Sequence, residues 1–361
     1  MRIVQLLPTM SFGDAVSNDA AAIRKMILEQ GYETEIYASN IDARLPEGLV
    51  AKPDKMAPLT VEDILVYHGS TGDPLNRLVP ELGGKKLMRY HNITPPEFFR
   101  GYDRGAELRT KAGYREIRAL SKAFDRCICD SDYNRQELRR MGYECPIDVC
   151  PIVIPFEDYD KEPDAEVLRK WQGDGWVNLL FVGRIAPNKK QEHVIRAFAQ
   201  YHRQYNPKSR LFLVGNPTGM EKYDTQLKNY AWDLGLAGRV IFTGQIPFKK
   251  ILAYYRLADV FLCMSEHEGF CVPLAEAMHF GKPIIALDAC AVPETLGEAG
   301  LVLEDASPEI AAAAIDRVMK DGELQAAFAR GRKKQLEKFA YESVKARMLE
   351  CIMAVLKQEE A

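Results

Sequence analysis

Short apolar runs alternate with longer amphipathic stretches along the whole chain. The runs have the length and composition of buried strands, and the stretches between them carry apolar residues at helical spacing. In the first half the expected strands are Ile3–Pro8, Glu35–Ala38, Ile64–His68, Leu87–His91, Cys127–Asp130 and Ile147–Ile154. In the second half they are Asn178–Gly183, Leu211–Gly215, Val240–Gly244, Val260–Met264, Pro283–Leu287 and Leu301–Leu303. This alternation is typical of parallel α/β sheets.

The repeat of this pattern predicts two domains. At 361 residues the chain is too long for one ordinary core. An acidic, proline-bracketed segment, Pro155–Asp164, separates the halves and has the composition of a linker. We therefore predict a Rossmann-like domain over residues 1–155, a linker over 156–176, a second Rossmann-like domain over 177–340 and a C-terminal helix over 341–361. Two doubly wound domains are expected to present their strand ends across a cleft, where open α/β sheets bind ligands.

Composition narrows the class of protein. The formal net charge of −3 gives no electrostatic case for nucleic-acid binding. No run approaches the roughly 18 apolar residues that span a bilayer, and the opening Met1–Pro8 is too short for a signal peptide. The eight cysteines contain no C-x-x-C pair, so reduced, buried thiols are expected and a metal site is not. These features predict a cytoplasmic protein.

The most informative local segment follows the strand Val260–Met264 and reads Ser265-Glu266-His267-Glu268-Gly269-Phe270-Cys271-Val272-Pro273-Leu274-Ala275-Glu276. Glycine permits a tight turn beside a ligand, and proline is tolerated in the first turn of a helix. The amides of that helix start would form an anion site, with Glu268 before it and Glu276 inside it. Taken alone, the segment fits equally an acidic, solvated turn before an ordinary helix.

A second segment favours the ligand-binding interpretation over the solvated turn. The strand Asn178–Gly183 runs into Arg184 and, five residues later, Lys189 at the start of a helix. A guanidinium and an ammonium so placed can converge on a diphosphate. The Walker spacing G-x-x-x-x-G-K-[ST] is absent, which disfavours ATP or GTP hydrolysis.

Together the two segments resemble the family-4 retaining glycosyltransferases of GT-B fold, also called glycosyl transferases group 1. The matching motifs are G-R-x-x-x-x-K, here Gly183-Arg184 to Lys189, and E-x-F-G-x-x-x-x-E, here Glu268 to Glu276. Gly281–Ala286 and Val292-Pro293-Glu294 are also similar to that family. The resemblance implies two Rossmann-like domains, with a C-terminal helix that crosses back to the first.

The same resemblance implies roles for individual residues. Arg184 and Lys189 would hold the donor diphosphate, Glu268 the sugar hydroxyls and Glu276 the ribose. The further donor-binding positions would be Gly183, Gly269, Phe270, Cys271, Val272 and Leu274. Cys271 stands where the family usually has glycine, which changes the expected shape of the sugar pocket.

The first domain offers two more candidates. Ser11–Asn18 resembles the family's glycine-rich loop, but only Gly13 is present and Asp14 takes the second glycine's place. Ser17 or Asn18 is expected to cap the helix that follows, Asn18–Gln30. His91, at the end of the strand Leu87–His91, matches a histidine of the family and is a candidate catalytic residue, with a satisfied structural histidine as the alternative. His68 is the weaker second candidate.

Two D-x-D triplets could bind a metal in a metal-dependent transferase. Asp130-Ser131-Asp132 stands at a strand-to-helix junction, where these residues are ordinary caps, and Asp158-Tyr159-Asp160 stands in the predicted linker. We therefore predict no metal and no cofactor besides the nucleotide-sugar substrate.

The segment Lys85–Arg126 is basic, with eleven cations against five acidic residues. With Phe98, Phe99, Tyr102 and Tyr114 interleaved, it could contact the inner membrane surface or a lipid-diphosphate acceptor. A solvated helix face is the alternative.

These features predict a retaining, metal-independent hexosyltransferase that moves a sugar from GDP-mannose or a UDP-sugar to a saccharide or lipid-linked acceptor. Surface polysaccharide (including lipopolysaccharide) or glycolipid assembly is the expected context. A nucleotide-sugar epimerase of the same fold and a non-catalytic sugar-nucleotide-binding protein remain alternatives.

Overall fold

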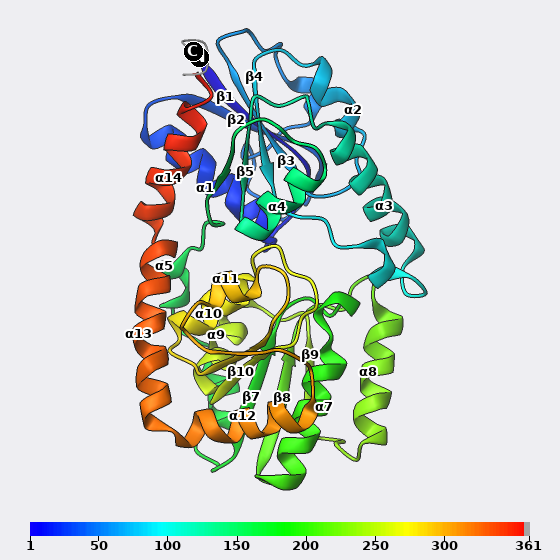
Figure 1. Cartoon of the computed structure of the whole chain (residues 1–361), viewed down its shortest axis with the longest axis vertical. Coiled ribbons are helices and arrows are strands. Elements are labelled where there is room, and N and C mark those ends of the chain that lie inside the picture. The colour runs from blue at the N-terminus through cyan, green and yellow to red at the C-terminus, as the bar shows by residue number, and fades with distance from the viewer. Residues whose placement is uncertain (357–361) are drawn as a thin grey trace. The chain divides into compact units, whose positions relative to one another are not determined.

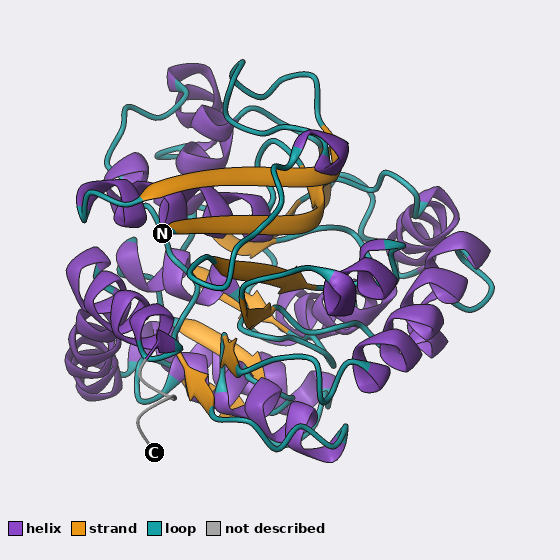
Figure 2. Ribbon diagram, turned by 90° about the horizontal axis from the view of Figure 1, so that it is seen from above, coloured by secondary structure: helices purple, strands orange, loops and turns teal. Residues whose placement is uncertain are grey.

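The computed structural model describes residues 1–356 and divides into two compact units. The first unit comprises Met1–Glu97, Arg104–Ile154 and the chain from Phe339 onward. The second comprises Phe98–Asp103 and Pro155–Lys338. In each unit helices flank a sheet of parallel strands (Figures 1 and 2).

The first unit contains a six-stranded sheet in the order β2-β1-β3-β4-β5-β6. Its strands are β1 (Arg2–Met10), β2 (Glu33–Ile41), β3 (Ile64–Gly69), β4 (Lys85–Tyr90), β5 (Arg126–Cys129) and β6 (Ile147–Val149). Its α-helices are α1 (Ala15–Glu29), α2 (Leu75–Leu78), α3 (Arg104–Ala119), α4 (Asp132–Arg140) and α14 (Tyr341–Met353), and short 3₁₀ turns occupy Pro53–Lys55, Val79–Glu81 and Pro96–Phe99.

The second unit also contains six parallel strands, in the order β12-β11-β10-β7-β8-β9. These are β7 (Val177–Val182), β8 (Ser209–Val214), β9 (Val240–Gly244), β10 (Val260–Cys263), β11 (Ile284–Leu287) and β12 (Leu301–Leu303). The helices are α5 (Phe156–Tyr159), α6 (Ala165–Trp171), α7 (Gln191–Gln204), α8 (Glu221–Asp233), α9 (Phe248–Leu257), α10 (Val272–His279), α11 (Val292–Leu296), α12 (Pro308–Lys320) and α13 (Gly322–Phe339), with a 3₁₀ turn at Pro187–Lys189.

The predicted α/β class and the doubly wound pattern of parallel strands are confirmed in both units. Central strands of parallel sheets are covered on both faces, which explains their nearly continuous apolar sequences. Leu65 of β3 and Leu211 of β8 are both fully buried. Strand ends differ from the predictions by one to three residues at most places, but β6 ends at Val149 rather than Ile154.

The C-terminal helix returns to the first unit, as predicted. Val344, Met348 and Ile352 of α14 are buried in one cluster with Ile3 of β1 and Ile23 of α1. Figure 1 shows α14, in red, beside α1. The helix was predicted over 341–361, and residues 357–361 lie outside the described part of the chain.

The start of α1 differs from the prediction. The helix begins at Ala15, and its N-cap is Asp14, whose carboxylate accepts a hydrogen bond from the Ser17 amide at 3.0 Å. The expectation that Ser17 or Asn18 caps the helix was therefore wrong. Asp14 lies three residues before Ser17 and starts the helix earlier, because an N-cap oxygen accepts from the second or third helical N–H.

The segment expected to be a linker, residues 156–176, carries the two short helices α5 and α6 in the second unit. Asp164 caps α6 by accepting from the Val167 amide at 2.9 Å. Trp171, at the end of α6, packs edge-on against Phe212 of β8, with ring centroids 5.4 Å apart. These aromatic contacts hold a segment whose composition alone favours an open linker.

A short stretch of the first half belongs to the second unit. Tyr102 lies edge-on to Tyr223 of α8 at 5.3 Å between ring centroids, and the Lys222 ammonium donates to the Gly101 carbonyl at 2.7 Å. Residues 98–103 are therefore part of the second unit although they follow the strands of the first.

Among residues 1–356, no helix is both long and apolar enough to span a membrane.

Candidate functional site

The strand order of the second unit makes two loops the candidate ligand-binding loops. The order reverses between β7 and β10, which lie side by side at the centre of the sheet. At such a switch point the connections from neighbouring strands leave toward opposite faces and open a crevice at the carboxyl ends. The loop after β7 contains Gly183 to Lys189, and the loop after β10 contains Glu268 to Val272. The two predicted motifs therefore meet at this point of the sheet.

Lys189 and Glu268 form the central contact of the site. The Lys189 ammonium donates to both carboxylate oxygens of Glu268, at 2.7 and 2.6 Å. Burial alone would lower the pKa of Lys189, but the Glu268 carboxylate outweighs that effect and raises the pKa above its ordinary value. The lysine side chain is 22% exposed and the glutamate 7%. The pair is thus charged and only partly reachable from solvent.

The turn that carries Glu268 is braced from two sides. The Asn188 side chain donates to the His267 carbonyl at 3.1 Å, and the Asn188 carbonyl accepts from the Glu266 amide at 2.9 Å. On the other side, the hydroxyl of Thr295 in α11 donates to the Phe270 carbonyl at 2.5 Å. These bonds hold Glu268 in place without a regular element around it.

The helix start follows directly after this turn. Cys271 is the N-cap of α10, and its backbone has φ +74° and ψ +67°, in the left-handed region. Positive φ is the conformation that favours glycine, so the departure from the family motif leaves a strained cysteine there. Val272 is the first helical residue, and the amides of this first turn carry the positive end of the helix dipole.

The other predicted residues of this motif contribute through the backbone. Leu274 is fully buried, and its amide already donates to the Cys271 carbonyl at 3.0 Å. The Phe270 side chain is 6% exposed, and Gly269 is half-buried. The side chains of Leu274 and Phe270 therefore have little room to contact a ligand.

Glu276 is engaged by two tyrosines. Tyr159 of α5 and Tyr255 of α9 each donate a hydroxyl hydrogen bond to one of its carboxylate oxygens, both at 2.5 Å. Burial raises the pKa of Glu276, while the two phenols oppose that rise. A ribose that bonds this carboxylate would have to replace or share one of the phenols.

Arg184 extends from the end of β7 and is exposed. Its guanidinium donates to the Thr218 carbonyl at 3.4 Å, in the loop after β8. The glycines beneath it are required by the backbone. Gly183 has φ +152°, and a Cβ on Gly215 would lie 1.9 Å from the Gly183 carbonyl oxygen. Backbone conformation at Gly183 and lack of space at Gly215 explain the glycines that follow β7 and β8.

Two thiols lie next to the charged pair. The sulfur atoms of Cys263 and Cys271 are 3.7 Å apart, and both are within 4.8 Å of a Glu268 oxygen. Two sulfurs and a carboxylate are possible ligands for a soft cation. The Lys189 ammonium already neutralises that carboxylate, so a cation would have to displace it.

The predicted residues of the first unit follow β1 and β4. Gly13 lies after β1 with φ +76°, and no atom lies within 4 Å of a Cβ built there. His91 follows Tyr90, and its side chain is only 2% exposed. One ring nitrogen is 2.9 Å from His68 Nδ1 and the other 3.1 Å from Asp130 Oδ2. Both nitrogens of the candidate catalytic histidine are therefore used inside the unit.

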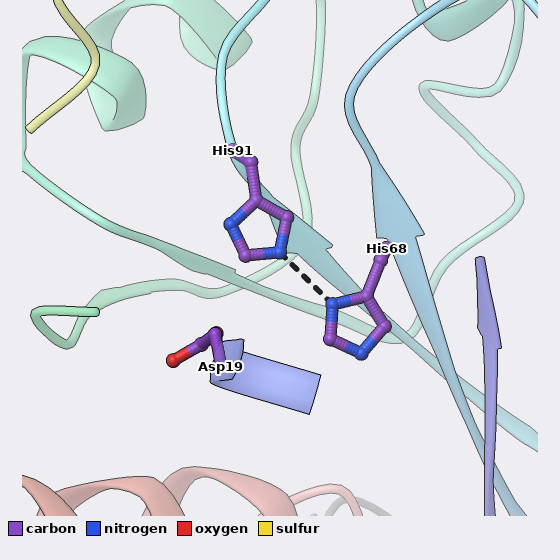
Figure 3. A group of neighbouring side chains, drawn as sticks. All are labelled: Asp19, His68 and His91. Carbon is purple, nitrogen blue, oxygen red and sulfur yellow. Dashed lines mark hydrogen bonds between the residues drawn. The ribbon is translucent and has the colours of Figure 1, made fainter. Parts of the chain in front are cut away.

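Asp19, His68 and His91 also lie close enough together to suggest a metal site (Figure 3). His68 and His91 face each other through two nitrogens 2.9 Å apart, which leaves space for a proton but not for an ion between them. Asp19 is paired with the guanidinium of Arg89 at 2.9 Å. The chemistry of this group is that of a hydrogen-bonded network.

In the D-x-D triplet at residues 130–132 the serine caps a helix and both aspartates form ion pairs. Ser131 is the N-cap of α4 and accepts from the Asn134 amide at 3.2 Å. Asp130 pairs with Arg89 at 2.7 Å, and Asp132 pairs with Arg135. In the other triplet, Asp160 bonds His279 at 2.9 Å.

The basic segment does not present its aromatic residues together. Phe98 and Tyr102 belong to the second unit, and Phe99 is buried. The Tyr114 hydroxyl donates inward to the Ile93 carbonyl at 2.8 Å. Arg89, counted among the cations, is fully buried. Phe99 and Arg89 are therefore buried and not exposed as an interleaved surface would require.

Several contributors were not predicted. The second-unit site is held by hydrogen bonds from Asn188, Tyr159, Tyr255 and Thr295. The first-unit group around His91 includes contacts of Gln5, Asp19 and Arg89. Asn188 stands inside the G-R-x-x-x-x-K motif, and Thr295 follows Val292-Pro293-Glu294, so proximity to a motif was a usable signal for those two. Tyr159 lies in the predicted linker, and nothing in the sequence around it indicated a contact with Glu276.

Comparison with known proteins identifies the second half of the chain. The family model described as "Glycosyl transferases group 1" matches residues 173–335. This range, less than half of the chain, is similar to the glycosyl transferases group 1 family. The matched range contains both motifs and all of the second-unit site except Tyr159.

Curated relatives agree with the family. A D-inositol 3-phosphate glycosyltransferase of Acidothermus cellulolyticus is 34% identical over 164 residues, covering 44% of this chain and 36% of the relative. The chain thus matches only about a third of the length of that relative. The O-antigen chain mannosyltransferase B of Escherichia coli is 25% identical over 294 residues, covering 77% of this chain and 71% of the relative.

Solved structures establish the fold. Sucrose-phosphate synthase from Thermosynechococcus elongatus has a TM-score of 0.76 at 19% identity, covering 99% of this chain and 100% of the other. Anabaena HepE, in complex with UDP-glucose, has a TM-score of 0.77 at 16% identity, covering 98% of this chain and 100% of the other. The predicted GT-B fold is confirmed.

The left-handed backbone at Cys271 yields a test of stability. We expect Cys271→Gly to be more stable than Cys271→Ala by about 1 kcal/mol, because both lose the thiol but only glycine relieves the positive φ. Urea denaturation followed by circular dichroism measures the difference. The opposite order, which is usual at helical positions, would show that this backbone is not left-handed in solution.

Proposed function

We propose that this chain is a retaining, metal-independent glycosyltransferase that uses a nucleotide-diphosphate sugar. The observation that carries the proposal is the Lys189–Glu268 pair at the start of α10, with Arg184 on a neighbouring strand end. Two cations and a helix start suit the diphosphate of a donor, and a carboxylate beside them suits sugar hydroxyls.

In the proposed reaction the bond between the anomeric carbon and the diphosphate oxygen breaks, and the acceptor oxygen bonds that carbon. The acceptor's hydroxyl proton passes to the departing diphosphate. Arg184, Lys189 and the first amides of α10 stabilise the negative charge that grows there, so catalysis is mainly electrostatic and positional. They supply the positive charge that a metal ion supplies in other transferases.

Retention at the anomeric carbon follows in this proposal from attack on the face that the diphosphate leaves. Glu268 lies in the turn just before the N-cap of α10, and both of its oxygens accept from Lys189. A carboxylate held in this way is suited to orienting hydroxyls rather than to forming a covalent sugar intermediate.

For the donor we propose GDP-mannose or a UDP-sugar. A relative from Mycolicibacterium smegmatis, 27% identical over 250 residues, is named a GDP-mannose-dependent mannosyltransferase. The fold also resembles HepE in complex with UDP-glucose. These names support both bases, and Glu276 is the proposed ribose contact for either. The acceptor is proposed to be a saccharide or a lipid-linked saccharide in surface polysaccharide or glycolipid assembly.

We further propose peripheral contact with an anionic membrane surface through α3. The helix exposes Arg104, Arg109, Lys111, Arg115 and Arg118, and Leu108 beside them is 55% exposed. A groove of about 870 Å³ runs between this helix and Arg140 of α4. Each basic residue near an anionic bilayer contributes about 1 kcal/mol.

The first test removes the exposed guanidinium. We expect Arg184→Ala to lower kcat by about 100- to 1,000-fold while the protein stays folded, because charge stabilisation in the transition state is lost. Release of nucleoside diphosphate measures the rate, and Lys208→Ala, an exposed lysine of the same unit, is the matched control. Full activity in folded Arg184→Ala would refute this role.

The donor can be found by thermal denaturation with UDP-, GDP- and ADP-sugars. A donor at 100 times its Kd should stabilise the protein by about 2.7 kcal/mol and raise Tm by about 5–10 °C. Glu276→Ala should weaken that shift if the carboxylate binds ribose. Nucleoside diphosphate should then appear only with an acceptor. Conversion of the donor without acceptor would indicate an epimerase, and binding without turnover a sensor.

Membrane contact is tested by co-sedimentation with vesicles of phosphatidylcholine alone or with added phosphatidylglycerol. We expect binding only to the anionic vesicles, and we expect Arg115→Glu with Arg118→Glu to weaken it at least about tenfold. High salt should do the same. Equal binding by this variant and by Lys208→Glu, which reverses a charge on the second unit, would argue against α3.

A further inference from the structure

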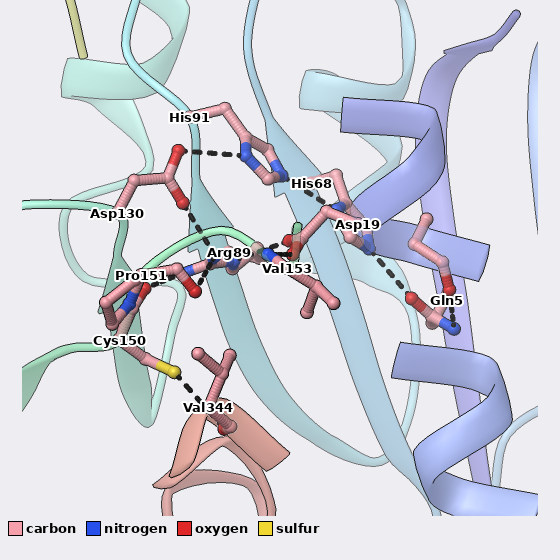
Figure 4. Close-up of polar contacts among 11 residues, drawn as sticks. Gln5, Asp19, His68, Arg89, His91, Asp130, Cys150, Pro151, Val153 and Val344 are labelled. Carbon is pink, nitrogen blue, oxygen red and sulfur yellow. Dashed lines mark hydrogen bonds and ion pairs between the residues drawn. The ribbon is translucent and has the colours of Figure 1, made fainter. Parts of the chain in front are cut away.

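A continuous polar network is buried in the first unit at the carboxyl ends of its central strands (Figure 4). It runs from Gln5 of β1 through His68 of β3 to His91, and then through Asp130 to Arg89 of β4 and Asp19 of α1. Arg89, Asp19 and His68 are fully buried, and Asp130 is 4% exposed. Polar groups this deep must be satisfied by one another, so their contacts reveal where the protons are.

The orientation of the Gln5 side-chain amide decides which atom donates in its hydrogen bond to His68. The Gln5 amide nitrogen donates to the Ala20 carbonyl at 3.0 Å, so its oxygen is the atom that faces His68 Nε2, also at 3.0 Å. His68 Nε2 must therefore carry a proton. Burial lowers the pKa of His68 well below its ordinary value, so this ring is neutral. A neutral ring with a proton on Nε2 has an unprotonated Nδ1 that can only accept.

The next two contacts concern His91. Its Nε2 lies 2.9 Å from His68 Nδ1, so it is the donor of that bond. Its Nδ1 lies 3.1 Å from Asp130 Oδ2. The other oxygen of Asp130 pairs with Arg89 at 2.7 Å, which favours the ionised carboxylate. An ionised carboxylate only accepts, so His91 Nδ1 must donate as well.

The charge balance calls for one further proton in the network. Arg89 pairs with Asp19 at 2.9 Å and with Asp130 at 2.7 Å, and its guanidinium also donates to the Cys150 carbonyl at 2.8 Å. Two buried carboxylates against one guanidinium leave one uncompensated negative charge. One further proton makes the network neutral, which burial in a low-dielectric interior favours, and the contacts of His91 place that proton on its ring.

We propose that His91 is held as an imidazolium with protons on both ring nitrogens, and that His68 and Gln5 are positioning residues that hold it in this state. Under the proposed function, on which this consequence rests, His91 serves as a fixed charge and not as an acid or base toward the acceptor. Both of its protons are donated inside the protein.

The test is NMR of the full chain with ¹⁵N-labelled histidine at neutral pH. The sequence has six histidines, and the His91 signals are identified by their loss in His91→Gln. We expect both His91 nitrogens to be protonated in the wild type, and His68 to be neutral with its proton on Nε2. An unprotonated nitrogen on His91 in the folded wild type would overturn the proposal, including the case in which Asp130 holds the proton.

Two variants separate positioning from packing. His68→Gln keeps an acceptor for His91 and a donor for Gln5, so the doubly protonated ring should persist. Asp130→Asn removes one negative charge, so His91 should become neutral in a folded protein. A neutral His91 in His68→Gln, or an unchanged imidazolium in Asp130→Asn, would contradict the mechanism.

A kinetic readout follows for His68→Leu, which fills the same space without an acceptor. We expect kcat to fall about tenfold with little change in KM, and His68→Gln to restore it. An equal loss in both variants would contradict positioning by hydrogen bonding. Because the NMR measurement needs no substrate, absence of transferase activity in the wild type would refute the proposed function and leave this inference to be decided by the protonation state.

Discussion

Parallel strand pairing is the constraint on which the rest of this structure depends. Each strand must be followed by a crossover to return in the same direction, so all carboxyl ends collect at one edge of the sheet. Where the strand order reverses, neighbouring connections diverge and leave backbone groups accessible. In the second unit this happens between β7 and β10, and it brings Lys189 to Glu268 across 79 residues of sequence. In the first unit the order reverses between β1 and β3, where Gly13 follows β1 and His68 lies near the end of β3.

Charged groups are partly or fully buried at the carboxyl ends of the strands in both sheets. The cost of their desolvation is offset differently in the two units. In the second unit one lysine is matched to one glutamate, and both retain some exposure. Such a pair can exchange partners when an anionic or hydroxyl-rich ligand arrives. In the first unit Arg89 and two aspartates are closed off from solvent. A network of that kind is costly to disturb and therefore suits a fixed role.

Local strain and local bracing occur together beside Glu268. Cys271 holds a left-handed backbone that a glycine would adopt more easily, and its neighbours are tied down by Asn188 and Thr295. Strained residues persist where surrounding bonds determine the backbone more strongly than the residue's own preference. The turn is thus shaped by its tertiary neighbours, and the cysteine in it is tolerated for that reason.

By itself the sequence determined the elements and the motifs. Apolar periodicity identified twelve strands and a separate C-terminal helix, because such signals are local. The resemblance of the segments around Arg184, Lys189, Glu268 and Glu276 to a known family indicated a glycosyltransferase, because those motifs are carried by fixed offsets along the chain. Only the tertiary structure decided which groups meet. The tyrosines on Glu276, the burial of Arg89, the place of residues 98–103 in the second unit and the use of both His91 nitrogens all join segments far apart in sequence. Such contacts depend on strand order and side-chain packing, and no local periodicity encodes them.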